Sequence, residues 1–235
     1  MSNSSLVDYT KISPYRGSRN GKKIDTVSIH CVVGQCGVEA LGSVFQTKEA
    51  SANYGIGYDG RIGMYVEESE RSWCTSSKAN DERAVTIECA SDAYHPYAVN
   101  DKVYAALIEL LVDICKRNGI AKLMWSTNKA DRVNHKNGCN MTVHRDYNSG
   151  KSCPGDYLYN RHQAIADAVN KKLTEDEEMV RWKTIDEIPE GLYRDTVKQL
   201  MADGIIKGKA DGVIDITEDM LRTMIFCQRI MEAKQ

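Results

Sequence analysis

The sequence predicts an α/β domain followed by a smaller, mainly helical domain. Strand-like segments alternate with amphipathic helical segments as far as about residue 174, an order that is typical of α/β folds. Beyond an acidic stretch only helical patterns follow. The length of 235 residues agrees, because at about 150 residues per domain it corresponds to about 1.6 domains. We therefore expect a first domain over 1–174, an acidic linker over 175–180 and a C-terminal domain over 181–235.

Four segments of the first domain have the composition of strands. Residues 25–33 are β-branched and apolar with almost no polar break, as in a strand that is covered on both faces. Residues 54–58 and 61–66 flank an Asp-Gly pair, which is the strongest short signal for a hairpin. Residues 84–90 repeat the apolar, β-branched composition of the first segment. These segments are expected to form the sheet.

Helical patterns lie between and after these strands. Residues 37–46 have the pattern of a short helix. The clearest helix covers about 100–117, where apolar residues recur at steps of three and four, and Gly119 is expected to end it. Residues 156–173 form a second such pattern, with His162 on its apolar face. The helices are expected to cover the sheet.

Composition and charge exclude several classes of protein. Hydrophobic residues make up 42% of the chain and charged residues 27%, which excludes collagen-like, disordered and coiled-coil proteins. The net charge of -2 provides no basic field for nucleic acid. That charge is unevenly divided, because 1–174 carry 22 Lys and Arg against 19 Asp and Glu, whereas 175–235 carry 9 against 14. The difference indicates two parts with different surfaces.

The sequence also predicts where the chain is made. No apolar run approaches the roughly 18 residues of a membrane span, so no membrane partner is expected. Residues 1–5 have neither the basic nor the apolar region of a signal peptide, which predicts synthesis in the cytoplasm. In that compartment the eight cysteines are expected to be reduced thiols or metal ligands. Four of them are expected to be small buried residues: Cys74, Cys89, Cys115 and Cys227.

The most specific chemistry is expected in a polar segment over 126–156, which follows a short strand over 123–125. A loop of this length is uncommon and usually functional. It holds His144 and, nine positions later, Cys153, followed by a Pro-Gly turn. Both residue types are preferred zinc ligands, and His30 at the end of a buried strand offers a third. Three protein ligands indicate a catalytic site with one open position. The alternative is that His30 is a core or edge residue satisfied by a backbone partner, as a lone histidine in a strand usually is.

Taken in order, these segments resemble the zinc-dependent N-acetylmuramoyl-L-alanine amidases. That family includes phage endolysins, bacterial wall-recycling amidases and animal peptidoglycan-recognition proteins. The resemblance spans about residues 20–170 and implies a mixed central β-sheet flanked by helices, with one Zn²⁺ per chain and bacterial peptidoglycan as the partner. It rests on the strand residue His30, the hairpin SANYGIGYDGRI, Trp73, the TIE strand that ends at Glu88, and the segment HRDYNSGKSCPGDY.

The resemblance also implies the residues of the site. By it, His30, His144 and Cys153 are the zinc ligands, and Glu88 and Lys151 are catalytic. Zinc would lower the pKa of bound water to about 7. Glu88 would accept the proton of this water and deliver it to the leaving amine, and Lys151 would stabilise the oxyanion. The bond that is cut would be the amide between the lactyl group of N-acetylmuramic acid and L-alanine.

Trp73, Tyr54 and His95 are the candidates for substrate binding. Trp73 and Tyr54 are expected to line a groove for glycan and peptide, and His95 follows the strand of Glu88. The alternatives are core aromatic residues and a surface histidine. Some branches of the family carry a catalytic tyrosine seven residues before the Asp-Gly pair of the hairpin, where this chain has Ala52. The sequence therefore fits the branch that relies on glutamate, and Tyr54 is not assigned a catalytic role.

Residues 182–222 resemble one surface-layer-homology-type repeat, a helix-loop-helix unit that binds wall polymers. Helices are expected over 192–203 and 217–233, with Thr217 as the N-cap of the second. A single copy buries little surface, so docking on the first domain or assembly into a homo-oligomer is expected, and a helical dimerisation tail is the alternative. Met179 is a candidate internal translation start. The order of Trp182, IDEIP, Val197, Leu200, GII, Gly208, Asp211-Gly212 and Arg222 carries this resemblance.

These observations predict an endolysin-type peptidoglycan hydrolase that is made in the cytoplasm and acts on the wall after release. One alternative is a cytosolic amidase that recycles muropeptides, which would need no wall-binding tail. Another is a non-catalytic peptidoglycan-recognition module, as in family members without the cysteine ligand, and the presence of Cys153 argues against it. A structural zinc domain would need a fourth ligand from the protein.

Overall fold

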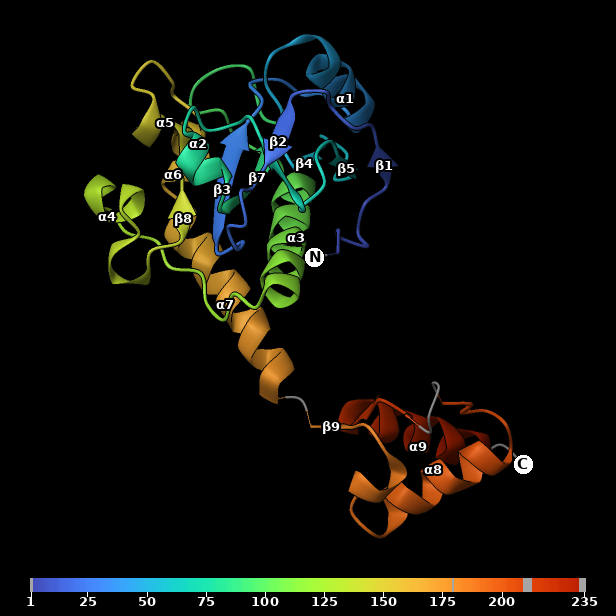
Figure 1. The fold of residues 1–235 in the computed structure, drawn as a ribbon. Coiled ribbons are helices and arrows are strands. Elements are labelled where there is room, and N and C mark those ends of the chain that lie inside the picture. Colours follow the sequence, from blue (N-terminus) through green and yellow to red (C-terminus); the bar gives the residue numbers. More distant parts are fainter. Residues whose placement is uncertain (1, 179, 209–212, 233–235) are drawn as a thin grey trace. The chain divides into compact units, whose positions relative to one another are not determined.

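The computed structural model describes residues 2–178, 180–208 and 213–232 (Figure 1). The chain divides into two compact units, residues 1–173 and 174–235. Within the described residues, no helix combines the length and the apolar character that crossing a membrane requires. Met179, the candidate internal start, lies outside the described residues.

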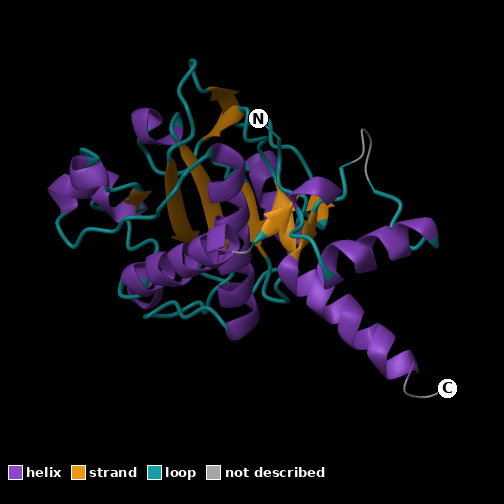
Figure 2. Ribbon diagram, turned by 90° about the horizontal axis from the view of Figure 1, so that it is seen from below, coloured by secondary structure: helices purple, strands orange, loops and turns teal. Residues whose placement is uncertain are grey.

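A six-stranded sheet forms the centre of the first unit, and helices lie around it (Figure 2). Strands β4 and β5 pair antiparallel across the predicted Asp-Gly turn, whereas the other neighbours in this sheet pair in parallel. The mixed sheet that the resemblance implied is therefore confirmed. Its order is β1 (Tyr9–Thr10), β5 (Ile62–Met64), β4 (Tyr54–Ile56), β7 (Ala84–Cys89), β3 (Thr26–Cys31) and β8 (Met141–Thr142). Strands β2 (Arg16–Ser18) and β6 (Glu70–Ser72) form a separate pair.

The two long strands β3 and β7 give the sheet one apolar and one polar face. Val27, Ile29 and Ile87 belong to the main core, together with apolar residues of the long helices α3 (Asp101–Asn118) and α7 (His162–Glu178). The alternate positions carry polar side chains, among them His30 and Glu88, which are direct register partners. Side chains of adjacent strands in register share a face. The segment expected to be apolar on both faces therefore buries a polar row, and this row positions the candidate site.

The ends of α3 follow the signals in the sequence. The side chain of Asn100 caps the helix by accepting a hydrogen bond from the backbone N–H of Val103 at 2.9 Å. Gly119 ends the helix in the left-handed conformation, with φ of 67°, which glycine adopts without a steric penalty. The helix predicted over 100–117 is thus confirmed. The shorter helix α1 (Val38–Thr47) packs with a second, smaller core cluster.

The polar segment over 126–156 is folded into short elements and is not an irregular loop. Helices of four or five residues are too short to show a hydrophobic period, so the sequence pattern did not reveal them. Residues 123–125 form no strand, because the backbone N–H and carbonyl of Leu123 both bond to the side chain of Asn170. The short elements are α4 (Lys129–Val133), the 3₁₀ turn η1 (Lys136–Gly138), β8, α5 (His144–Tyr147) and the start of α6 (Gly155–Tyr159); α2 (Lys78–Asp81) is equally short.

The second predicted helix of the first domain also differs in its limits. It is divided into α6 and α7, which begins at His162. Helix α7 then continues to Glu178, so that most of the acidic segment predicted as a linker over 175–180 is helical. Glutamate is a good helix former, so an acidic run need not end a helix.

The second unit has a small core of its own. Strands β9 (Arg181–Trp182) and β10 (Ile216–Thr217) pair antiparallel. Helices α8 (Leu192–Ala202) and α9 (Glu218–Glu232) agree with the predicted helices, and the 3₁₀ turn η2 (Ile185–Glu187) precedes them. The hydroxyl of Thr217 accepts from the backbone N–H of Met220 at 3.2 Å, as expected for an N-cap. The core residues are Trp182, Ile188, Val197, Ile214, Ile216 and Leu221.

The buried ring of His162 predicts a loss of stability in acid. Its Nδ1 donates to the carbonyl of Leu158 at 2.8 Å, and its Nε2 has no partner among the described residues. Burial lowers the pKa of His162 to about 4. The unfolded chain, with an ordinary pKa near 6.5, therefore takes up this proton first as the pH falls. The stabilisation that the neutral ring provides is therefore complete above pH 6.5. It is lost as the pH falls from 6.5 to 4, and the total loss in the free energy of unfolding is roughly 3 kcal/mol.

A variant separates this contribution from that of other groups. In His162→Gln the position no longer titrates, so the free energy of unfolding should fall less steeply between pH 6.5 and 4 than in the wild type. Denaturant unfolding of the first unit at several pH values measures both slopes. Parallel slopes would show that His162 does not titrate differently in the folded and unfolded states.

Candidate active site

The fold brings His30, His144 and Cys153 together. His30 lies near the end of β3, His144 begins α5, and Cys153 lies in the turn before α6. Their ligand atoms all lie within 4.8 Å of one another. The Sγ atom of Cys153 is 3.2 Å from Nδ1 of His30, and the two imidazole rings are 5.3 Å apart between centroids. This is the trio that the resemblance implied as metal ligands.

The protonation of the two histidines suits a metal, and that of the cysteine depends on one. Burial lowers the pKa of His30 well below its ordinary value, and burial together with Lys151 lowers the pKa of His144 to about 4. Both rings are therefore neutral at pH 7, which is the form that offers a lone pair. Burial, with contributions from Cys31 and Glu88, raises the pKa of the Cys153 thiol well above its ordinary value. A bound cation would reverse this effect and favour the thiolate.

A serine fixes the tautomer of His30. The Oγ of Ser28 donates its one hydrogen to the carbonyl of Thr142 at 3.2 Å, because a carbonyl oxygen only accepts. At 3.1 Å from Nε2 of His30, the same Oγ must therefore accept the N–H of the ring. The lone pair of His30 is then on Nδ1, the atom that faces Cys153. This second interaction orients the ring as metal-binding histidines require.

Glu88 lies beside the three candidate ligands, and its two carboxylate oxygens differ in their surroundings. Its Oε1 is 3.9 Å from Nδ1 of His30 and accepts a weak hydrogen bond from the thiol of Cys74, also at 3.9 Å. Its Oε2 is buried and has no partner among the described residues. Burial raises the pKa of Glu88 to about 7, although the bond from Cys74 and the charge of Lys151 oppose the increase. A carboxyl group that titrates near neutral pH can both accept and donate a proton.

A cavity of about 330 Å³ opens over this group. Within the described parts of the chain, the ammonium of Lys151 has no hydrogen-bond or ion-pair partner, so it is available to a bound molecule. A second cavity of about 330 Å³, which Arg71 and Lys78 help to line, shares several wall residues with the first. Trp73 lies in both walls and is 38% exposed. The residues with candidate chemistry in the first wall are Glu88, His144, Lys151, Cys153, Trp73 and Cys74.

Tyr54 does not reach this cavity, contrary to the expected groove. It is the register partner of Ile87 and so faces the apolar side of the sheet, whereas Gly55 pairs with Glu88. Tyr54 is fully buried, and its hydroxyl donates to Glu68 at 2.7 Å. The alternative of a core aromatic residue therefore describes Tyr54.

His95 is an exposed residue that contacts α6. Its Nε2 lies 2.8 Å from Oδ2 of Asp156, in the helix that follows Cys153. His95 is not among the residues that line the two cavities around Lys151. The structure thus gives His95 a contact with the helix that follows Cys153, and its expected contact with substrate stays a prediction.

Two residues of the site were missed at the level of sequence. Cys74 is not merely a small buried residue, because it lines the cavity and donates to Glu88. Ser76 lies 2.9 Å through its Oγ from Nε2 of His144. The signal available in the sequence was their position one and three residues after Trp73, which was itself a candidate.

Solved structures share the fold of the first unit. A selenomethionine derivative of AmpD superimposes with a TM-score of 0.51 at 19% identity, covering 69% of this chain and 96% of that one. The catalytic domain of XlyA gives 0.50 at 15% identity, covering 69% and 99%. The Staphylococcus aureus hydrolase AmiA, in complex with its ligand, gives 0.51 at 16% identity, covering 75% and 87%. A comparison with curated proteins gives no match.

The family of the chain follows from a direct match of the sequence. The model of the N-acetylmuramoyl-L-alanine amidase family matches residues 14–156, which is more than half of the chain. This range contains the three candidate ligands together with Glu88 and Lys151. The chain therefore belongs to the N-acetylmuramoyl-L-alanine amidase family.

Proposed function

We propose that the protein is a zinc-dependent, endolysin-type peptidoglycan hydrolase that cleaves the amide bond between N-acetylmuramic acid and L-alanine. The observation that carries the proposal is the convergence of His30, His144 and Cys153 next to Glu88, whose Oε2 has no partner among the described residues. Two imidazoles and a thiol are the donors that zinc prefers, and three of them leave a position open. Membership of the amidase family supports the choice of bond.

Each residue of the cavity has a role in this reaction. Zinc held by His30, His144 and Cys153 would supply a Lewis acid and an activated water nucleophile at neutral pH. Glu88 accepts the proton of the attacking water and returns it to the amine of L-alanine as the carbon–nitrogen bond breaks. Lys151, whose ammonium has no hydrogen-bond or ion-pair partner among the described residues, stabilises the negative charge that develops on the carbonyl oxygen. The products are the lactyl carboxylate and a peptide with a free amino terminus.

The intact wall is the proposed substrate, because a second unit with its own core follows the amidase unit. A recycling amidase that acts on soluble muropeptides would not need such a unit. In this proposal the second unit binds a wall polymer or joins copies of the chain into a homo-oligomer. The protein is made in the cytoplasm and reaches the wall after release.

Wall digestion with product analysis tests the proposed function. Full-length protein loaded with zinc should clear a suspension of purified walls and release new L-alanine amino termini without new reducing sugar ends. Removal of zinc by a chelator should stop the reaction, and added zinc should restore it. Cleavage of soluble muropeptides but not of walls would favour the recycling amidase. Wall binding without new amino termini would indicate a non-catalytic recognition module.

A further inference from the structure

The side chain of Arg145 holds in place the loop over 148–153, which carries Lys151 and Cys153. Arg145 lies directly after His144 in α5. Its Nε and Nη2 donate to the carbonyl oxygen of Ser152 at 3.1 and 2.6 Å. Its backbone N–H donates to the carbonyl oxygen of Cys153 at 3.1 Å. Arg145 thus ties the helix that begins at one candidate ligand to the backbone next to another.

The guanidinium of Arg145 is itself fixed on two sides. Its Nη1 and Nη2 both lie 3.0 Å from Oδ1 of Asp156, and it stacks over the ring of Tyr159 at 4.5 Å. The other carboxylate oxygen of Asp156 bonds to His95 at 2.8 Å. A planar guanidinium in such a setting presents its donors in one direction, which a flexible ammonium does not. The hydrogen bond between His95 and Asp156 is therefore part of the network that fixes Arg145.

The placement of Lys151 depends on the backbone of the loop. Because its ammonium has no partner among the described residues, no polar contact of its own holds the side chain toward the cavity. Ser152, whose carbonyl oxygen accepts hydrogen bonds from Arg145, lies between Lys151 and Cys153 in the sequence. A displacement of about 1 Å at a reacting group can lower a rate by roughly 100-fold. The hydrogen bonds from Arg145 to Ser152 therefore affect the position of two side chains, the proposed catalytic Lys151 and the proposed ligand Cys153.

We propose that Arg145 is a positioning residue of the active site, which holds the backbone around Ser152 so that Lys151 and Cys153 face the same cavity. This inference rests on the proposed function for the roles of Lys151 and Cys153. Groups that orient metal ligands typically contribute 10–100-fold to metal affinity or activity. Arg145 acts through its neighbours and has no assigned contact with the substrate.

Three variants test the positioning role. Arg145→Met keeps the length of the side chain and removes its donors, and Arg145→Lys keeps the charge but cannot bond to Ser152 and Asp156 together. Arg161→Met is the matched control, because Arg161 also stacks on a tyrosine, over Tyr157 at 3.8 Å, and bonds to a backbone carbonyl at 3.2 Å. Chelator competition should show zinc affinity roughly 10–100-fold weaker in Arg145→Met, intermediate in Arg145→Lys and unchanged in Arg161→Met. The Michaelis parameters should show a lower kcat with a smaller change in KM.

A measurement on metal-free protein keeps this inference separate from the proposed function. Backbone amides of residues 148–153 should exchange hydrogen faster in Arg145→Met than in the wild type or in Arg161→Met. Unchanged exchange, zinc affinity and kcat in Arg145→Met would overturn the positioning role. An equal loss in both arginine variants would also overturn it, because it would show a general effect on stability. A wild type that binds no zinc and cleaves no wall would instead reject the proposed function, and the exchange result would still decide whether Arg145 restrains the loop.

Discussion

Replacement of Glu88 with glutamine is expected to lower kcat for wall cleavage by roughly 100- to 10,000-fold, which is the usual contribution of a general base. Glutamine has nearly the same shape and preserves the packing of β7 against β3, but its amide cannot accept the proton of the attacking water. The Oε2 of Glu88, which has no partner in the part of the chain that the structure describes, is the atom whose chemistry is lost. Zinc affinity should change little, because Glu88 is not one of the three proposed ligands.

Cys153→Ser provides the contrasting result. A neutral hydroxyl is a poorer ligand for zinc than a thiolate, so this variant should lose both the metal and the activity. Zinc content and kcat, measured on the same preparations, separate a variant that binds metal without turnover from one that does not bind metal. Wild-type kcat in Glu88→Gln, at full zinc content, would contradict the assignment of Glu88 as the proton acceptor.

The sequence predicted the elements that have long hydrophobic patterns. Helix α3 has five turns of apolar period, an asparagine cap and a terminal glycine, so both its existence and its limits could be predicted. Helix α5 has four residues, of which one is His144, and no periodic signal exists at that length. The polar row of β3 was hidden for another reason. Ser28 and His30 alternate with apolar residues, but burial of the polar face depends on what packs there.

The candidate site could be predicted only in part for a similar reason. His144 and Cys153 lie nine positions apart in one polar segment, but His30 lies 123 positions before Cys153, so that spacing alone could not join them and the resemblance was needed. Tyr54 was misplaced because its face depends on its register with β7, which a single strand does not specify. Cys74 acquires its role from the proximity of Glu88, fourteen positions later in the sequence. The positions of these side chains thus depend on contacts between strands and loops, which the hydrophobic pattern of a single segment does not specify.

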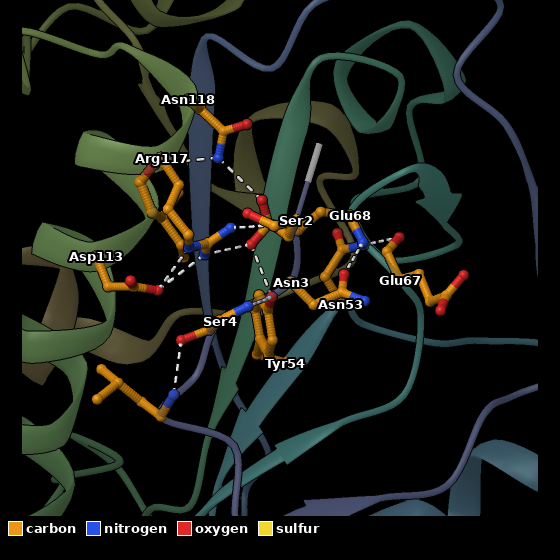
Figure 3. Close-up of polar contacts among 12 residues, drawn as sticks. Ser2, Asn3, Ser4, Asn53, Tyr54, Glu67, Glu68, Asp113, Arg117 and Asn118 are labelled. Carbon is orange, nitrogen blue, oxygen red and sulfur yellow. Dashed lines mark hydrogen bonds and ion pairs between the residues drawn. The ribbon is translucent and has the colours of Figure 1, made fainter. Parts of the chain in front are cut away.

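Replacement of Glu68 with alanine is expected to lower the free energy of unfolding of the first unit by roughly 3–5 kcal/mol. The side chain of Glu68 is fully buried between strand β4 and the end of α3 (Figure 3). It accepts hydrogen bonds from Nη2 of Arg117 at 2.6 Å, from Nδ2 of Asn118 at 2.9 Å and from the hydroxyl of Tyr54 at 2.7 Å. Its removal leaves the buried hydroxyl of Tyr54 without its acceptor and takes one of two carboxylate partners from Arg117, which keeps Asp113 at 2.8 Å. Leaving buried donors unsatisfied is costly.

The same network holds the beginning of the chain. The backbone N–H of Glu68 donates to Oδ1 of Asn3 at 2.9 Å, and the guanidinium of Arg117 also donates to the carbonyl of Ser2 (Figure 3). The backbone N–H of Ser4 donates to the hydroxyl of Tyr54 at 2.9 Å. Loss of the carboxylate therefore weakens the attachment of the N-terminal segment as well as the contact between β4 and α3. Hydrogen exchange in residues 2–7 should increase in the same variant.

Glu70→Ala is the matched control for this prediction. Glu70 pairs with Arg16 at 2.6 Å, but both side chains are more than one third exposed. An ion pair in such a setting contributes only about 0–1 kcal/mol, because water screens it and two long side chains must be ordered to form it. Denaturant unfolding of the first unit, monitored through the hydrogen exchange of amides in α3, measures both variants. The loss in the free energy of unfolding should be larger by several kcal/mol for Glu68→Ala than for Glu70→Ala. Equal losses would mean that water reaches the Glu68 network. The kcat of the folded fraction should be unchanged in Glu68→Ala, because Tyr54 faces away from Glu88 and the network supports the fold without contacting the proposed substrate.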